Sequence, residues 1–176
     1  MADMNVNYIN PFLEAAIAIV KDACQVELKI GKPYAKMVEL TEGTVVILIG
    51  VTGEMRGQVV LSIDEKKACE IASRMMMGMP VPELDDMAIS AISELGNMIM
   101  GNAATVFSVR NIGIDITPPT VGRGTGKIDT MYTKNIAIPL LTGDSEVFME
   151  MNIAMKIGST YYETIRHTGI CWCVFF

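Results

Sequence analysis

The polar residues best placed for chemistry in this chain are a carboxylate and an amide, Glu94 and Asn97, preceded by the hydroxyl of Ser90. Residues three and four apart lie on the same side of an α-helix, so a helix here would present all three side chains in one line. A carboxylate can pair with a cation, and an amide both donates and accepts hydrogen bonds without carrying a charge. Taken alone, however, a Glu and an Asn are also what an ordinary solvated helix surface shows.

A long helix is expected over roughly residues 86–109, and its residues 86–107 have the periodicity that this arrangement needs. Wound at about 100° per residue, one side is apolar and should be buried: Ala88, Ile89, Ile92, Leu95, Gly96, Ile99, Met100, Ala103, Val106 and Phe107. The other side should be exposed, and it also carries Met87, Ser93, Met98, Gly101 and Thr105. A solvated face is usually rich in Lys, Arg and Glu, whereas this one is small and weakly charged. It would let a partner approach closely.

The N-terminal half of the chain predicts one helix followed by strands. Asn10 and Pro11 suit the N-cap and first position of a helix that continues to Cys24. Beyond it the apolar pattern becomes that of β-structure, with turn signals at Gly43 and Gly53. It predicts consecutive antiparallel strands over residues 26–30, 35–40, 44–51 and 55–63.

The rest of the chain completes an α+β pattern. A short helix is expected over residues 64–78, before the long helix, and Pro139 suggests an edge strand or a bulge. The remaining segments are a β-like run, a glycine-rich loop and two more β-like runs, at residues 113–117, 121–127, 135–141 and 147–155. We therefore expect a two-layer α/β domain with an antiparallel-rich sheet of about six strands.

Composition predicts one domain. Of the 176 residues, 51% are hydrophobic and only 6% aromatic, so the core must be aliphatic, with the 15 methionines filling gaps in it. We assign residues 1–156 to this domain. Residues 157–176 hold the single His and Trp of the chain and break its pattern, so we expect a tail that is disordered or foreign to the domain.

Several classes of function are disfavoured by composition. The net charge of −6 and the absence of a Lys/Arg cluster argue against nucleic acid as a partner. No apolar run reaches the roughly 18 residues of a membrane span, and the N-terminus does not resemble a signal peptide, so we expect a cytoplasmic protein. The four cysteines lack metal-ligand or redox spacing, and one His cannot support histidine-based catalysis.

Two further motifs have simpler explanations than catalysis. The sequence GRGTGK at residues 122–127 suggests a phosphate-binding loop, but Val121 and Ile128 stand where that motif requires Gly and Ser or Thr. We interpret it as a flexible hairpin or crossover loop. The paired carboxylates Asp85 and Asp86 suit the start of the long helix better than a pair of acid and base residues.

The spacing of Ser90, Glu94 and Asn97 on a long helix, with Pro119 downstream, resembles the active-site signature of the CheC, CheX and FliY phosphatases. That signature is an Asp or Ser, a Glu and an Asn, followed by a proline; Pro119 lies one position before the place of the family's proline. The order of elements over residues 5–156 is also similar. This chain carries one copy of the helix signature, whereas CheC-like members carry two, so the resemblance favours the CheX subtype.

The resemblance implies a phosphatase that acts on the aspartyl phosphate of a CheY-like response regulator. It implies that Asn97 positions the hydrolytic water, that Glu94 pairs with a lysine of the regulator, and that further contacts come from Ser90, Met98, Gly101 and Pro119. It also implies a homodimer without a cofactor of its own, and Mg²⁺ bound to the regulator. The alternative from another class is a noncatalytic signalling module that binds a phosphorylated receiver domain through the same helix face.

Overall fold

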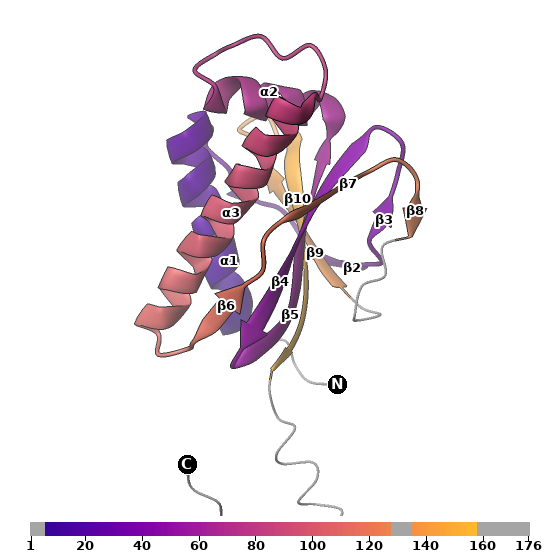
Figure 1. Ribbon diagram of the computed structural model, residues 1–176. Coiled ribbons are helices and arrows are strands. Elements are labelled where there is room, and N and C mark those ends of the chain that lie inside the picture. The colour runs from indigo at the N-terminus through magenta and orange to yellow at the C-terminus, as the bar shows by residue number, and fades with distance from the viewer. Residues whose placement is uncertain (1–5, 128–134, 158–176) are drawn as a thin grey trace, which may run out of the picture.

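The computed structural model describes residues 6–127 and 135–157, arranged as helices packed on a curved sheet (Figure 1). The helices are α1 (Val6–Cys24), α2 (Glu65–Met75) and α3 (Asp86–Val109). The strands are β1 (Lys29–Ile30), β2 (Tyr34–Lys36), β3 (Glu39–Leu40), β4 (Thr44–Gly53), β5 (Met55–Asp64), β6 (Ile114–Ile116), β7 (Thr120–Arg123), β8 (Gly126–Lys127), β9 (Asn135–Leu141) and β10 (Val147–Ile157). All but the first residue of the expected tail, 157–176, lies outside the described residues.

The main sheet is antiparallel and eight-stranded within the described ranges. Its order is β1-β9-β10-β5-β4-β6, with β2 also paired to β9 and β7 also paired to β4, while β3 and β8 form a separate two-stranded sheet. The helices lie together on one side of the main sheet (Figure 1). The predicted α+β class and two-layer arrangement are therefore confirmed.

The core lies between α3 and the central strands. Alternation along β4 sends Val45, Ile47 and Ile49 toward the helices, where all three are fully buried. Gly96 lets α3 come close to the sheet, because a Cβ at this position would lie only 3.0 Å from Ile47 Cγ2. This close approach fixes the position of α3.

The prediction of four consecutive antiparallel strands before residue 64 is half wrong. β4 and β5 do form a hairpin, with Val45 opposite Ile63 and Val51 opposite Gly57. The earlier segments instead pair far along the chain, β1 and β2 with β9 and β3 with β8. β1, β2 and β3 are only two or three residues long, too short to form a hairpin with one another. They pair instead along the edges of strands that come later in the chain.

The predicted start of the first helix is also wrong. α1 begins at Val6, and Pro11 lies inside it instead of at its first position. Proline has no N–H to offer the carbonyl of Asn7, four residues earlier. Arg110, at the end of α3, donates from Nη1 to that oxygen at 3.4 Å. A distant side chain thus supplies a donor at the point where Pro11 cannot.

Two further expectations need correction. The segment 121–127 is not a flexible loop, because β7 pairs with β4 and β8 with β3, with a turn at Gly124, where φ is +99°. Pro139 lies neither in an edge strand nor at the bulge, which falls in β10 between Val147 and Met149. Pro139 lies in β9 opposite the gap between β1 and β2, where no strand residue requires an N–H from it. Its carbonyl accepts a hydrogen bond from Gly31 N at 2.8 Å.

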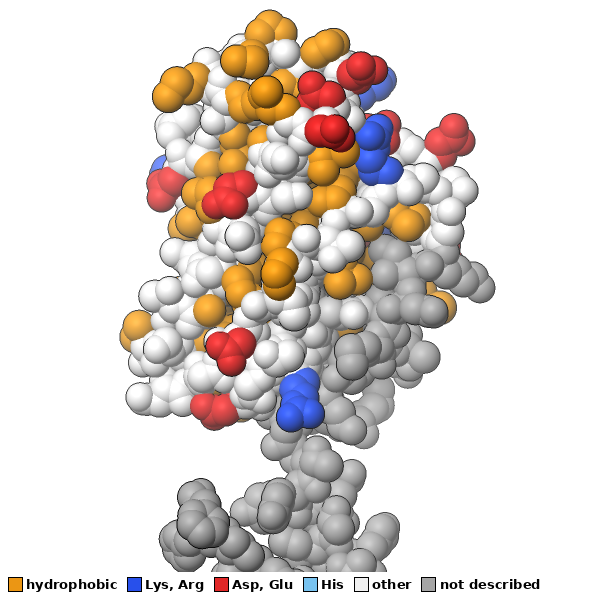
Figure 2. Space-filling model, viewed as in Figure 1, with side chains coloured by type: hydrophobic (Ala, Val, Ile, Leu, Met, Phe, Trp, Pro, Cys, Tyr) orange, Lys and Arg blue, Asp and Glu red, His pale blue; other side chains and the backbone are white. Residues whose placement is uncertain are grey.

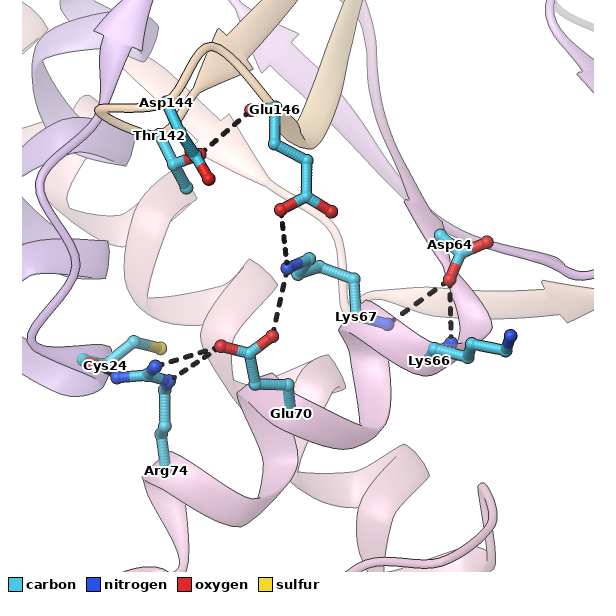
Figure 3. A network of polar contacts seen from close by, with 9 residues as sticks. All are labelled: Cys24, Asp64, Lys66, Lys67, Glu70, Arg74, Thr142, Asp144 and Glu146. Atoms are coloured by element: carbon cyan, nitrogen blue, oxygen red, sulfur yellow. Dashed lines mark hydrogen bonds and ion pairs between the residues drawn. The ribbon is translucent and has the colours of Figure 1, made fainter.

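Helix α2, capped by Asp64 as its acidic start predicted, is fixed by a network of charged side chains (Figure 3). Lys67 Nζ lies 3.0 Å from Glu70 and 3.4 Å from Glu146, which precedes β10. Arg74 pairs with Glu70 at 2.9 Å and donates to the carbonyl of Cys24 at 3.1 Å. α2 is thereby connected to the end of α1 and to the β9–β10 turn.

We expect Gly57→Ala to destabilise the fold. A Cβ at Gly57 would lie 2.2 Å from the carbonyl oxygen of Ala154, and a neighbouring strand backbone cannot move away as a flexible side chain can. The free energy of unfolding, measured by urea denaturation, should fall by about 1–3 kcal/mol. Gly143→Ala is the control, because a Cβ there meets nothing within 4 Å. Equal stability of the two variants would contradict the close approach of β5 and β10.

Candidate functional site

The candidate site is the side of α3 that faces away from the sheet. α3 begins after Asp85, whose carboxylate accepts a hydrogen bond from Ala88 N at 2.8 Å, as the sequence predicts for a helix-start residue. The predicted inner residues are buried except Ile89 and Val106, which are partly exposed. On the opposite side Ser90, Glu94 and Asn97 are exposed. The predicted orientation of the helix is therefore confirmed.

The polar side chains of this face are not engaged by other residues that the structure describes. Within residues 6–127 and 135–157, no hydrogen bond or ion pair is made by the side chains of Ser90, Glu94 or Asn97. Figure 2 shows α3 from its outer side, a largely uncharged surface with few acidic groups. A carboxylate and an amide held outward on a rigid helix can bind groups of a second molecule.

Two glycines of α3 occupy opposite environments. Gly96 is buried against Ile47, which explains the absence of a side chain there. Gly101 is partly exposed, one turn after Asn97, and a Cβ at this position would meet nothing within 4 Å. Its carbonyl accepts a hydrogen bond from Thr105 Oγ1 at 3.1 Å. Packing within the protein therefore does not require a glycine at 101.

Pro119 lies on a different element from the other predicted site residues. It belongs to the link between β6 and β7, which runs beside α3 (Figure 1). Thr117 holds this link on β4, because its N–H donates to Gly50 O at 3.0 Å and its Oγ1 accepts from Gly50 N at 2.8 Å. The structure thus gathers Ser90, Glu94, Asn97, Met98 and Gly101 on one helix face and places Pro119 on an adjacent segment.

Sequence reasoning missed an arginine that fixes the start of this helix. Arg123 of β7 donates from Nη1 to the carbonyl of Leu84 at 2.9 Å, and its Nε lies 3.3 Å from Glu65 of α2. The three residues line a surface pocket of about 520 Å³ between α2, β7 and the linker to α3. The only signal in the sequence is a cation within the segment 121–127, whose glycine-rich pattern predicts a flexible hairpin or crossover loop.

Other sources of chemistry are weak in the described part of the chain. Burial raises the pKa of the Cys24 thiol to about 11, and the pKa of Cys69 is raised mainly by burial, so both thiols are protonated at neutral pH and poor nucleophiles. Residues 6–127 and 135–157 contain no group of three or more His, Cys, Asp or Glu placed to hold a metal ion. No helix in these ranges has the length and apolarity needed to cross a bilayer.

Comparisons with known proteins agree on one family. The family model described as chemotaxis phosphatase CheX matches residues 45–141. The CheY-P phosphatase CheX of Thermotoga maritima is 30% identical over 155 residues, which are 88% of this chain and 99% of that protein.

Solved structures give the same result. A CheC-like superfamily protein from Shewanella sp. PV-4 superposes with a TM-score of 0.75 at 29% identity, covering 87% of this chain and 99% of that one. CheX in a complex with CheY, BeF3 and Mg²⁺ from Borrelia burgdorferi superposes with a TM-score of 0.69 at 29% identity, covering 86% and 99%. The similarity spans α3 and the sheet that supports it.

Proposed function

This chain belongs to the CheX family of chemotaxis phosphatases, and we propose that it removes the phosphoryl group from the phosphorylated aspartate of a CheY-like response regulator. The observation that carries the proposal is the unengaged pair Glu94 and Asn97 on the exposed face of α3. In the Thermotoga relative the activity is that of a CheY-P phosphatase, and the Borrelia relative is seen bound to CheY.

Asn97 is the residue that we propose acts on the reaction. An acyl phosphate already has a good leaving group, so the main requirement is a water held in line with phosphorus. The Asn97 amide can accept a hydrogen bond from this water and donate one to a phosphoryl oxygen. The water oxygen bonds to phosphorus, the bond to the aspartate oxygen breaks, and the products are the aspartate carboxylate and inorganic phosphate, which takes the water's proton.

Glu94 has a different role in this proposal. It lies nearly one turn before Asn97 on the same face, so its carboxylate can pair with a lysine beside the phosphoryl group of the regulator. Such a pair sets the register between two proteins, and a charge-assisted hydrogen bond is about twice as strong as a neutral one. The Mg²⁺ belongs to the regulator in our proposal, which the Borrelia complex of CheX with CheY, BeF3 and Mg²⁺ supports. We place Ser90, Met98, Gly101 and Pro119 at the margin of the contact.

We also propose that the protein acts in the cytoplasm as a homodimer. The strands β1 and β2 form an outer edge of the main sheet, and Ile30 and Tyr34 on this edge are large and half exposed. Such an edge can pair with a second copy of the chain.

The proposed roles predict different defects for two alanine variants. Asn97→Ala should lower the rate of dephosphorylation roughly 100-fold with little loss of binding, because the water loses its position while the Glu94 pair that sets the register remains. Glu94→Ala should weaken binding of the regulator about tenfold and also reduce turnover, because its charge pair is lost. Loss of phosphate from the phosphorylated regulator gives the rate, and titration calorimetry with its BeF3-bound form gives the affinity.

The exposed Glu42, in the link between β3 and β4, provides the control Glu42→Ala, which should behave like the unmodified protein. Equal losses of binding and turnover in Asn97→Ala and Glu94→Ala would contradict the separate roles. If the unmodified protein binds the regulator but does not accelerate its loss of phosphate, the protein is the noncatalytic signalling module and the phosphatase proposal fails.

Gly101 allows a test that separates stability from function. A glycine inside a helix costs about 0.5–1 kcal/mol relative to alanine, so Gly101→Ala should raise the free energy of unfolding by that amount. Gly101→Leu should also fold, because the space around this position is open. If the regulator packs directly on the helix here, Gly101→Leu should raise KM about tenfold. An unchanged KM would place Gly101 outside the contact.

A further inference from the structure

The described methionines include a buried group and an exposed group at one end of the molecule. Met55, Met100, Met149 and Met151 are buried in the core, as composition predicts. Three others are exposed on or just after the loop between α2 and α3: Met77 is 100% exposed, Met79 54% and Met87 60%. Figure 2 shows hydrophobic side chains gathered at the top of the molecule, where α2 and the start of α3 lie in Figure 1. The expectation that methionine serves the core is wrong for this second group.

The loop that carries Met77 and Met79 is held by backbone hydrogen bonds. Gly78 N donates to Ser73 O at 2.8 Å, and Met79 N donates to Met76 O at 3.2 Å. Met77 has a φ of +57°, a left-handed conformation that is uncommon for a residue with a side chain. This conformation and the Gly78 N–Ser73 O bond close the end of α2, a role that needs no apolar side chain at position 77. The side chain of Met77 is nevertheless held in water, where it adds no packing among the described residues.

Met87 connects this surface to the candidate site. It lies three positions before Ser90, on the exposed side of α3, and about 15 Å from Asn97 along the helix axis. A standard protein interface covers about 800 Å² on each partner, which corresponds to a disc of roughly 16 Å radius. A regulator centred on Asn97 would therefore reach Met87, and the loop with Met77 and Met79 continues outward from there, since it leads into the start of α3 (Figure 1).

The charges around the methionines indicate the chemistry of the partner. Glu83, Asp85 and Asp86 lie between Met79 and Met87 in sequence, and all three are exposed. A complementary surface would be apolar at its centre with basic groups at its margin. Methionine is flexible and polarizable, and it is common on surfaces that adapt to their partners.

We propose that Met77, Met79 and Met87 form a docking surface, the methionine surface, which binds an apolar patch with basic margins on the same response regulator that α3 dephosphorylates. This inference rests on the proposed function, and it adds a determinant of regulator choice that is separate from Glu94 and Asn97. The methionine surface acts on association only, since it lies too far from Asn97 to touch the phosphoryl group.

The test is a triple variant, Met77→Gln, Met79→Gln and Met87→Gln, which keeps side-chain length and helix propensity but removes apolar area. The probe is a CheY-like regulator encoded in the same genome, phosphorylated for kinetics and BeF3-bound for titration calorimetry. We expect KM and Kd to rise about tenfold, as for the loss of a strong interface contact, with kcat unchanged. The matched control is Met37→Gln, because Met37 is 62% exposed but follows β2 on another part of the molecule.

Four outcomes decide between the possibilities. If the unmodified protein dephosphorylates the regulator and the triple variant has unchanged KM and Kd, the methionine surface is not a docking surface. If the triple substitution changes only the oligomeric mass measured by sedimentation equilibrium, the methionine surface is a contact between two copies of the chain. That result also overturns the proposal. If Met37→Gln weakens binding equally, the effect is not specific, and the proposal fails.

If the unmodified protein binds the BeF3-bound regulator without accelerating loss of phosphate, and the triple variant binds it more weakly, the methionine surface stands and the proposed catalysis fails.

Discussion

The burial of one side of α3 against β4 determines where every candidate residue points. Ile92, Leu95 and Ile99 are fully buried beneath the helix, and burial of each such side chain is worth about 1.5–3 kcal/mol. Turning α3 by one residue would bring these side chains toward water and force Glu94 toward the core. The orientation of Glu94 and Asn97 is therefore set by the apolar residues on the opposite side of the helix, and it requires no contact made by the polar side chains themselves.

This arrangement separates stability from function within one helix. The inner side includes Gly96, which lets the helix approach Ile47, and the outer side includes Gly101, which nothing in the protein requires. The start of the helix is held independently by Arg123, through the carbonyl of Leu84 and the carboxylate of Glu65. Outer residues can thus change with little effect on the fold, which suits a surface selected for a partner.

The parts of this structure that the sequence predicted are those that depend on local pattern. The bounds of α3 and its exposed face follow from a period of 3.6 residues over more than six turns. The errors arise where a distant segment decides the outcome. β1 and β2 extend along β9, and Arg110 supplies a donor near Pro11 from the end of another helix. Composition likewise could not distinguish the buried methionines from Met77, because exposure depends on how the loop folds.

A site that offers only an amide and a carboxylate must work through position. In the proposed reaction the phosphoryl group, its leaving group and the metal all belong to the regulator, so this chain contributes no new reactive group. A misplacement of about 1 Å in such a reaction can cost about 100-fold in rate. The accuracy with which α3 sits on the sheet then becomes part of the catalysis, although none of the residues that provide it can touch the substrate. This is why a long, well-packed helix suits the reaction better than a loop, whose conformational freedom would be lost at each encounter.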